Sequence, residues 1–303
     1  VTAAGLCHSD LHVQKGYMDL GEEGRLTFAE RGAQLPMTFG HEIAGIVEAI
    51  GDDVKTVSKG QQVLVFPWIG CGDCLACNED RESDCSAMRI IGLKQKGGFA
   101  THCLIENEKF LVNIDGLDAA DVVPHACSGI TVYNALEKIG PLRDAEWLAV
   151  MGCGGLGLNA IAIARAMGFG NIIGIDIDNS KLDAARQMGA SKTLNSKSAN
   201  AVADLQKFAE SRLMAVIDTF GGESTGQLAV RALAKSGQYL LVGQAGGDFK
   251  MPQVWLPQKA MMVRGSHVGN SPQLRKLIDM VRAGKLKQMP IERRQLSEIN
   301  QAV

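Results

Sequence analysis

The chain has 303 residues, enough for two domains that each bury a core. Its net charge is −2, so the composition favours neither nucleic acid nor an anionic membrane as a partner. Charged residues make up 21% and hydrophobic residues 46%, a mixture typical of globular proteins. No apolar run reaches the roughly 18 residues that a membrane helix needs, so we expect no membrane association.

Residues 1–127 have the pattern of a β domain. Glycine-containing turns separate short apolar runs at 43–50, 62–66, 101–105 and 110–114. No regular alternation of helices and strands is visible in this part. The pattern predicts an all-β or barrel-like domain.

Four cysteines within this part are spaced C-x2-C-x2-C-x7-C, at Cys71, Cys74, Cys77 and Cys85. Short turns with glycine return thiolates to one point, as tetrahedral zinc requires. An iron–sulfur cluster would also accept four thiolates, but the fourth spacing and the missing proline differ from that signature. Two disulfides would use four cysteines as well, with strain in such tight loops. We therefore predict a structural zinc lobe.

The eight cysteines occur without a secretory leader, which favours a reducing, cytoplasmic compartment where thiols bind metals. We place a domain boundary near Ser128 and predict that a continuous helix over 130–139 joins the domains.

The middle of the chain predicts a dinucleotide site. An apolar run at 146–151 leads into Gly152, Gly154, Gly155 and Gly157, then a helical pattern, then a second strand that ends in Asp176. The glycines allow a tight turn and close approach of a pyrophosphate to a helix N-terminus. Asp176 would accept hydrogen bonds from the ribose and repel a 2′-phosphate, which favours NAD over NADP. The alternative is a helix start that needs glycine only for packing.

Strands and helices go on alternating as far as residue 265, with helices predicted over 180–188, 201–211 and 225–234. Six strands in this arrangement predict a parallel doubly wound sheet with its ligand at the carboxyl ends. Val242, Gly243 and Val268 would then face the cofactor, or be ordinary packing residues at strand ends. An amphipathic helix over 272–283 follows.

Five motifs together resemble those of the zinc-dependent medium-chain alcohol dehydrogenases. In chain order they are G-x-C-H-S-D-x-H at 5–12, G-H-E-x-x-G at 40–45, the four-cysteine lobe, A-C-S-G-x-T-x-Y at 126–133 and G-x-G-G-x-G at 152–157. The resemblance runs along the whole chain. It implies an α/β fold with a β-rich, GroES-like catalytic domain over 1–128, to which 269–303 return, and a Rossmann domain over 129–268.

The resemblance also implies a catalytic zinc held by Cys7, His41 and Cys127. Two thiolates and an imidazole leave a fourth position open for water or substrate. Taken alone, these residues could equally be buried packing residues. Glu42 could approach the metal or could be a solvated carboxylate, and Asp10 could orient His41.

Further roles follow from the same resemblance. Ser9 and His12 would relay the alcohol proton to solvent, and His8 would face the cofactor pyrophosphate. Trp68 would narrow the alcohol pocket, or be a core tryptophan. Thr131 would lie beside the nicotinamide and Lys181 near the adenine ribose, although helix packing and a solvated lysine explain them too.

The expected protein is thus an NAD-dependent alcohol dehydrogenase with two zinc ions per chain. It would interconvert a small alcohol with its aldehyde or ketone and would form a homo-oligomer, a dimer or tetramer. One alternative is a dehydrogenase of a bulkier hydroxyl substrate, such as an alicyclic hydroxyacyl-CoA or a polyol. Another is a non-catalytic NAD-binding fragment.

Three features depart from the family pattern. The chain starts at the Cys7 motif and stops at Val303, so we interpret it as truncated at both ends. The segment 17–34 is unusually long and charged. Such an insertion is expected to influence substrate choice or assembly, or else to be a surface loop without a role.

Overall fold

The computed structural model describes residues 1–302 and divides into two compact units. Unit 1 contains Val1–Tyr17, Leu26–Ile130 and the tail that starts at Val268. Unit 2 contains Met18–Arg25 and Thr131–His267. Val303, the last residue of the predicted return segment, lies outside the described residues.

Unit 2 is built on a parallel six-stranded sheet with the strand order β11-β10-β9-β12-β13-β14. The strands are β9 (Trp147–Met151), β10 (Ile172–Asp176), β11 (Lys192–Asn195), β12 (Leu213–Asp218), β13 (Gln238–Leu241) and β14 (Met262–Gly265). Every residue of β9 and β10 is buried, because a central parallel strand is covered on both faces. The predicted doubly wound sheet is confirmed.

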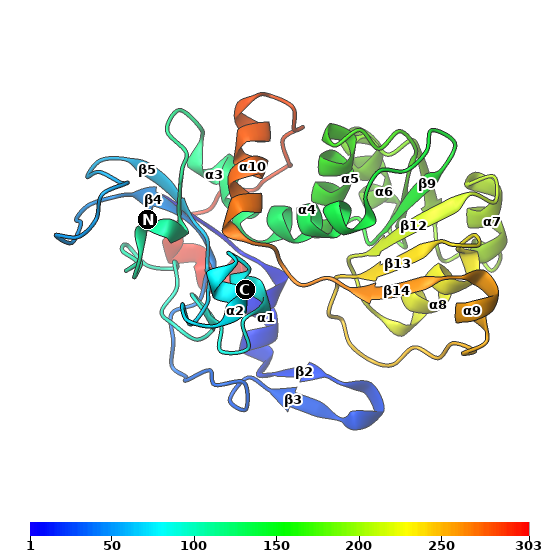
Figure 1. The fold of residues 1–303 in the computed structure, drawn as a ribbon, viewed down its shortest axis with the longest axis horizontal. Helices are drawn as coiled ribbons and strands as arrows, with labels where there is room; N and C mark the ends of the chain where they lie inside the picture. Colours follow the sequence, from blue (N-terminus) through cyan, green and yellow to red (C-terminus); the bar gives the residue numbers. More distant parts are fainter. Residues whose placement is uncertain (303) are drawn as a thin grey trace. The chain divides into compact units, whose positions relative to one another are not determined.

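Helices cover both faces of this sheet (Figure 1). The pair α5 (Gly155–Ala166) and α6 (Asn179–Met188) packs against β9, β10 and β11. The pair α7 (Ala201–Phe208) and α8 (Glu223–Ala232) packs together, with α8 against β12. The short helix α9 (Trp255–Lys259) precedes β14. The side chains between these layers form an apolar core that includes Met151, Ile173 and Val216.

The helical pattern expected over 201–211 is too long at its C-terminus. Helix α7 ends at Phe208, and Glu210 and Ser211 have positive φ angles of 51° and 60°. A left-handed residue cannot continue a right-handed helix. Helices α6 and α8 start and end within two residues of the predicted positions, whereas the sequence pattern predicts no helix where α9 forms.

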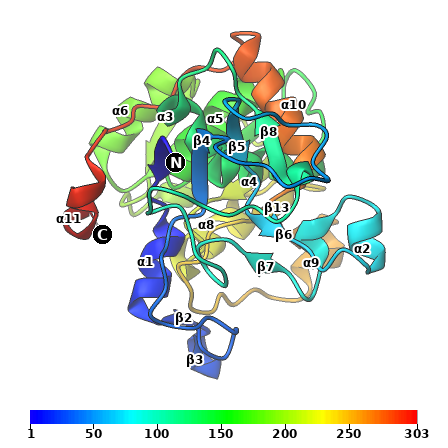
Figure 2. The same cartoon turned by 90° about the vertical axis from the view of Figure 1, so that its left-hand side faces the viewer.

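Unit 1 contains an antiparallel sheet with the order β1-β4-β5-β8 and a separate strand pair, β6-β7 (Figure 2). The strands are β1 (Ala3–Gly5), β4 (Glu42–Ile46), β5 (Gln62–Val65), β6 (Trp68–Ile69), β7 (Arg89–Ile90) and β8 (Leu111–Asn113). This is the GroES-like antiparallel domain that the resemblance implied.

One predicted strand of unit 1 is wrong. Residues 101–105 form no strand, although the run contains β-favouring residues such as Thr101 and Ile105. A strand needs a neighbouring strand that forms hydrogen bonds with its backbone groups. Among the described residues no strand pairs with this run, and the Val1 ammonium alone donates to the Thr101 carbonyl. Leu104 is accordingly 89% exposed.

Unit 1 also contains helices and 3-10 turns. The helices are α1 (His8–Lys15), α2 (Leu75–Asn78), α3 (Ala119–Val122), α10 (Ser271–Arg282) and α11 (Ile299–Ala302), and the 3-10 turns are η2 (Glu82–Asp84), η3 (Glu108–Phe110), η4 (Val123–Ala126) and η5 (Leu296–Glu298). Helix α3 packs against β1 and β4. Helix α4 (Ser128–Ile139) starts in unit 1 and continues into unit 2.

The long charged segment forms a hairpin of β2 (Tyr17–Asp19) and β3 (Arg25–Thr27), with the 3-10 turn η1 (Gly21–Glu23) at its tip (Figure 1). The tip packs on the loop that follows β13. The Glu22 amide donates to Asp248 at 2.7 Å, and Lys250 pairs with the Glu22 carboxylate at 2.8 Å. The tip therefore belongs to unit 2.

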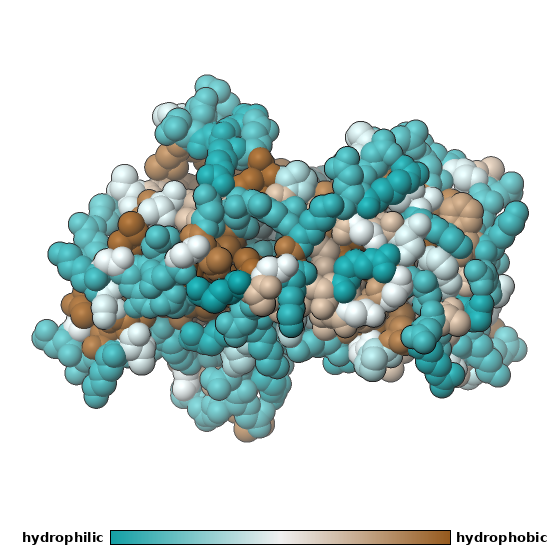
Figure 3. Space-filling model, turned by 90° about the horizontal axis from the view of Figure 1, so that it is seen from above, coloured by the Kyte–Doolittle hydropathy of each residue, from teal (hydrophilic) through white to brown (hydrophobic). Residues whose placement is uncertain are grey.

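Hydrophilic residues cover most of the face drawn in Figure 3, and hydrophobic residues form only separate patches on it. Across residues 1–302, no helix has both the length and the apolar composition to cross a membrane.

Candidate active site and zinc sites

Cys7, His41 and Cys127 meet in unit 1, although 120 residues separate the two cysteines. One donor atom from each side chain lies within 4.8 Å of the others. Cys7 immediately precedes α1, His41 immediately precedes β4, and Cys127 lies between η4 and α4. The contact between β4 and η4 explains how segments so far apart in sequence converge.

The geometry of this set fits a tetrahedral metal ion. The two sulfurs are 3.8 Å apart, and zinc–sulfur bonds of about 2.3 Å place tetrahedral ligands about 3.8 Å from one another. His41 is fully buried, and its Nε2 is a buried nitrogen without a hydrogen-bond partner among residues 1–302. An orphaned imidazole nitrogen beside two thiols is the donor set that zinc binds.

Asp10 fixes the orientation of His41. Its Oδ1 lies 3.3 Å from His41 Nδ1, so the other ring nitrogen is left for a metal. The same carboxylate accepts hydrogen bonds from the amides of Cys7 and Gly40, at 3.0 and 3.2 Å. Asp10 therefore positions a ligand from each of two distant segments, as carboxylates beside metal-binding histidines commonly do.

The electrostatics of Cys7, His41 and Cys127 favour a cation between them. A hydrogen bond from Cys127 lowers the pKa of Cys7 well below its usual value, whereas that bond and burial raise the pKa of Cys127. Burial alone would lower the pKa of His41, but Asp10 and Cys7 outweigh it and raise that pKa. The two thiols cannot both ionise at 3.8 Å without a neutralising charge.

Glu42 and Trp68 border the same set. Glu42 is buried, and burial raises its pKa well above the usual carboxyl value. The Trp68 ring lies edge-on to His41, with a centroid distance of 5.8 Å. Its Nε1 donates to the Ala126 carbonyl at 3.3 Å, directly before Cys127. Trp68 thus lies beside the metal set and also helps to position one ligand.

The remaining residues of the first motif lie on α1. His8 is exposed in the first turn of this helix. The centroids of the His8 and His12 rings are 4.8 Å apart. Ser9 is half-buried and lies one turn from His12, so the two share a face of the helix. Burial, and then the neighbouring His8, lower the pKa of His12 below its usual value.

The four cysteines of the lobe form a second candidate zinc site. Their sulfurs lie within 4.8 Å of one another, with Cys71 3.9 Å and Cys74 3.5 Å from Cys77. These distances bracket the separation expected around tetrahedral zinc and exclude disulfide bonds. A hydrogen bond from the Cys77 amide lowers the pKa of Cys74 to about 7, which favours the thiolate that zinc requires.

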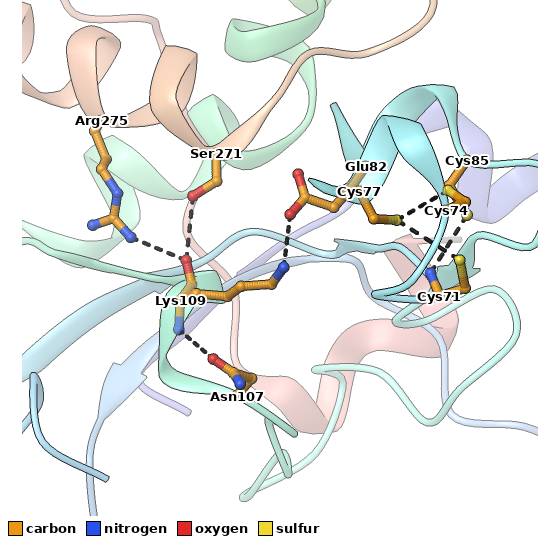
Figure 4. Close-up of polar contacts among 9 residues, drawn as sticks. All are labelled: Cys71, Cys74, Cys77, Glu82, Cys85, Asn107, Lys109, Ser271 and Arg275. Atoms are coloured by element: carbon orange, nitrogen blue, oxygen red, sulfur yellow. Dashed lines mark hydrogen bonds and ion pairs between the residues drawn. The ribbon is translucent and has the colours of Figure 1, made fainter. Parts of the chain in front are cut away.

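A buried carboxylate connects the lobe to the rest of unit 1 (Figure 4). Glu82 pairs with Lys109 Nζ at 3.0 Å, and only 2% of its side chain is exposed. The Lys109 carbonyl accepts hydrogen bonds from Ser271 at 3.3 Å and Arg275 at 3.0 Å, both on α10. The lobe, η3 and α10 are therefore linked through one lysine, which the sequence did not single out.

Replacing Cys85 with serine tests the lobe. We expect zinc content to fall by one ion per chain and the melting temperature to fall, because metal-binding energy is folding energy in such a lobe. Elemental analysis and thermal denaturation measure the two effects. Cys103→Ser is the matched control, since Cys103 belongs to neither cysteine set. Full zinc retention in the Cys85 variant would show that the lobe binds no zinc.

The dinucleotide fingerprint lies in unit 2, where β9 ends and α5 begins. Gly152 has a φ of +84°, which favours glycine. A Cβ at Gly157 would lie 1.7 Å from the Gly152 carbonyl, so a side chain is excluded there. The structure thus forms a close turn at the N-terminus of a 12-residue helix. Such a terminus attracts phosphate through its free amides and its dipole.

Asp176 ends β10 beside this turn. Its Oδ2 accepts a hydrogen bond from the Cys153 amide at 2.7 Å, and its Oδ1 accepts from the amides of Ile177 and Asp178 at 2.8 and 3.0 Å. The carboxylate is therefore fixed between the glycine turn and the start of α6, at the carboxyl edge of the sheet.

The other predicted cofactor residues are more dispersed. Thr131 is buried in α4, and Lys181 is exposed on α6 near Asp178. Val242 is buried directly after β13. Val268 is buried in unit 1 and has a φ of +26°. The roles of these four residues stay predictions.

Two apolar residues that the sequence analysis did not select stand out at the carboxyl edge of the sheet. Ile177 follows β10 and is 57% exposed, and Phe220 follows β12 and is 53% exposed. Exposed apolar side chains beside a phosphate-binding turn suit the flat face of a nucleotide base. A signal was present in the sequence, since Ile177 directly follows the strand-ending Asp176 and Phe220 lies two residues after the strand-ending Asp218.

Comparisons with known proteins agree with this arrangement. Residues 1–116 match the alcohol dehydrogenase GroES-like domain, and residues 155–283 match the zinc-binding dehydrogenase family. NAD-dependent alcohol dehydrogenases of Sulfurisphaera tokodaii and Saccharolobus solfataricus are each 36% identical over 306 aligned residues. Each alignment covers 100% of this chain and 86% of the relative.

Solved structures show the same fold. The alcohol dehydrogenase of Aeropyrum pernix superposes with a TM-score of 0.89 at 27% identity, over 99% of this chain and 85% of that one. The D-arabinose dehydrogenase of Sulfolobus solfataricus superposes with a TM-score of 0.86 at 26% identity, over 97% and 88%. The chain belongs to the zinc-dependent medium-chain alcohol dehydrogenase family.

Proposed function

We propose that the protein is an NAD-dependent, zinc-containing alcohol dehydrogenase that reversibly transfers a hydride between an alcohol and NAD. The observation that carries this is the convergence of Cys7, His41 and Cys127 around an orphaned imidazole nitrogen. The dinucleotide fingerprint and the NAD-dependent relatives support the choice of cofactor.

The site residues have distinct proposed roles. Cys7, His41 and Cys127 would hold the zinc, and Asp10 keeps the imidazole aligned. Zinc held there would supply Lewis acidity to the alcohol oxygen, and NAD would accept the hydride. Glu42, buried beside the ligands, is proposed as an additional partner of the metal. Trp68 is proposed to narrow the space for the alcohol.

The cofactor contacts are proposed as a second set. The turn formed by Gly152, Gly154, Gly155 and Gly157 would hold the pyrophosphate, and Asp176 would bind the ribose. Further contacts are proposed for His8, Thr131, Lys181, Val242 and Val268. We propose residues 1–128 with 269–303 as the catalytic domain and residues 129–268 as the NAD-binding domain.

The assay that tests this function is NADH formation by the zinc-loaded protein with a panel of primary, secondary and alicyclic alcohols. Polyols and sugars belong in the panel, because the structural relatives include a D-arabinose dehydrogenase and a galactitol-1-phosphate dehydrogenase. Turnover of simple alcohols supports the proposal, and exclusive turnover of polyols supports the bulkier-substrate alternative. NADH binding without turnover of any substrate supports a non-catalytic protein.

Ser9 and His12 are proposed to carry the alcohol proton to solvent. We expect His12→Gln to slow single-turnover oxidation by about 10²-fold, the lower end for general-base assistance, because water can substitute at a half-buried histidine. A base must be unprotonated, and the pKa of His12 is lowered. The difference in single-turnover rate between parent and variant should therefore persist from neutral into mildly acidic pH. It should vanish below the pKa of His12, where the parent histidine is protonated as well. Overlapping pH profiles of parent and variant would make His12 a bystander.

We also propose that the protein is a cytoplasmic homo-oligomer. Within residues 1–302 all eight cysteines are free thiols, which suits a reducing compartment. Strand β14 is the edge of the six-stranded sheet, and Met262 and Val263 on it are 51% and 38% exposed. An exposed apolar edge strand is a ready site for pairing with a second copy. Light scattering of the purified chain tests this, and a monomer would contradict it.

A further inference from the structure

Thr219 lies directly after β12, at the base of the glycine turn. Its half-buried Oγ1 is 2.8 Å from the Met151 carbonyl oxygen and 2.8 Å from the Gly152 carbonyl oxygen. Its amide also donates to the Met151 carbonyl, at 2.9 Å. One side chain therefore contacts both carbonyls at the point where strand β9 becomes the turn.

Strand register explains this position. In the parallel pair β12–β9, Asp218 lies opposite Met151, so the next residue, Thr219, falls beside Gly152. A Cβ built on Gly152 would lie 2.9 Å from Thr219 Oγ1, and one built on Gly157 would lie 3.2 Å from it. The hydroxyl thus packs against Gly152 and Gly157, the first and the last glycine of the fingerprint. It lies close to where a side chain on either residue would begin.

We propose that Thr219 is a positioning residue for NAD binding, an inference that rests on the proposed function. The hydroxyl hydrogen is shared between the two carbonyls and fixes the peptide that joins Met151 to Gly152. That peptide sets the direction in which the turn leaves the strand. It therefore sets where the amides at the start of α5 point toward a pyrophosphate.

The turn after β12 has its own support, so the hydroxyl can be removed without removing that turn. Asp218 Oδ1 accepts hydrogen bonds from the amides of Phe220 and Gly221, at 3.0 and 2.8 Å. Asp218 Oδ2 in turn accepts from the Tyr239 hydroxyl at 2.9 Å. Valine has the shape and branching of threonine but cannot donate, so Thr219→Val isolates the hydroxyl.

The experiment compares Thr219→Val and Thr219→Ser with the parent in zinc-loaded protein. Thr193→Val is the matched control, because Thr193 Oγ1 in the same unit is buried and has no hydrogen-bond partner in the described part of the chain. NADH affinity is measured by fluorescence titration, and kcat and both KM values are measured with an alcohol that the parent turns over. Zinc content and melting temperature are recorded for each variant.

For Thr219→Val we expect the Kd for NADH and the KM for NAD to rise about tenfold, equivalent to about 1.4 kcal/mol, the upper range for one hydrogen bond. The value of kcat and the KM for alcohol should stay within about twofold. Thr219→Ser should recover most of the affinity, and Thr193→Val should match the parent. Thr219→Ala provides a second hydroxyl-free variant in case the valine variant does not fold.

Two results would overturn the inference alone. One is unchanged NADH affinity in the hydroxyl-free variant. The other is a loss of affinity that serine does not recover and that follows a fall in melting temperature, since that indicates general destabilisation. A parent protein that binds no NADH would overturn the proposed function together with the inference, so the two failures are distinguishable.

Discussion

Replacing His41 with alanine is expected to reduce kcat/KM for alcohol by about 10³-fold or more. A metal ion that polarises a substrate oxygen contributes several kcal/mol to transition-state stabilisation, and about 4 kcal/mol corresponds to this factor. Because His41 supplies the imidazole of the three-residue set, zinc content should also fall by one ion per chain. Steady-state kinetics and elemental analysis measure the two effects.

The NADH affinity of the His41 variant is the internal reference for this experiment. The fingerprint lies in unit 2 and His41 in unit 1, so NADH should still bind with parental affinity. His102→Gln is the matched control, since His102 is exposed in the same unit and belongs to neither candidate zinc set. Retained activity at parental zinc content would remove His41 from the proposed active site.

The double change Asp176→Gly with Ile177→Arg is expected to raise the ratio of NADP to NAD efficiency by about 10²-fold. The reason is the loss of a carboxylate that repels a 2′-phosphate, together with the gain of a cation that attracts it. Like charges brought together cost several kcal/mol, and about 3 kcal/mol corresponds to this factor. The ratio of kcat/KM values for the two cofactors is the measurement.

Overall efficiency with NAD should fall in the same variant for a second reason. Asp176 accepts a hydrogen bond from Cys153, so its loss also loosens the glycine turn. Asp178→Ser is the control, because serine removes the neighbouring charge but can keep the cap on α6 that Asp178 provides. An unchanged cofactor ratio in the double variant would mean that Asp176 does not face the ribose.

The features that could be predicted from the sequence depend on residues that lie close together along the chain. The glycine turn, the strand before it and the acid after it lie within 146–176, so their spacing alone predicts a dinucleotide site. The four lobe cysteines lie within 15 residues, from 71 to 85, for the same reason. Cys7, His41 and Cys127 are far apart, and only the resemblance to a family could group them.

What the sequence could not predict depends on pairing between distant segments. Residues 101–105 contain β-favouring residues, yet no strand forms there, because a strand requires a neighbouring strand as well as a suitable composition. The contact of Thr219 with Gly152 depends on the register of β12 on β9, which no local pattern encodes. The sequence does not predict helix α1 either, because its eight residues carry no clear apolar stripe at helical spacing.

The hairpin tip has a consequence for the order of folding. The bond from the Glu22 amide to Asp248 joins residues 226 positions apart, and the Lys250–Glu22 pair joins residues 228 apart. On the ribosome, residues 18–25 emerge early but must wait for most of the chain before their partner loop exists. Closing so long a loop has a large entropic cost, and these exposed contacts stabilise the docked tip only weakly. The tip should therefore dock last and, at equilibrium, detach first, so its amides should exchange with solvent well before those of β9.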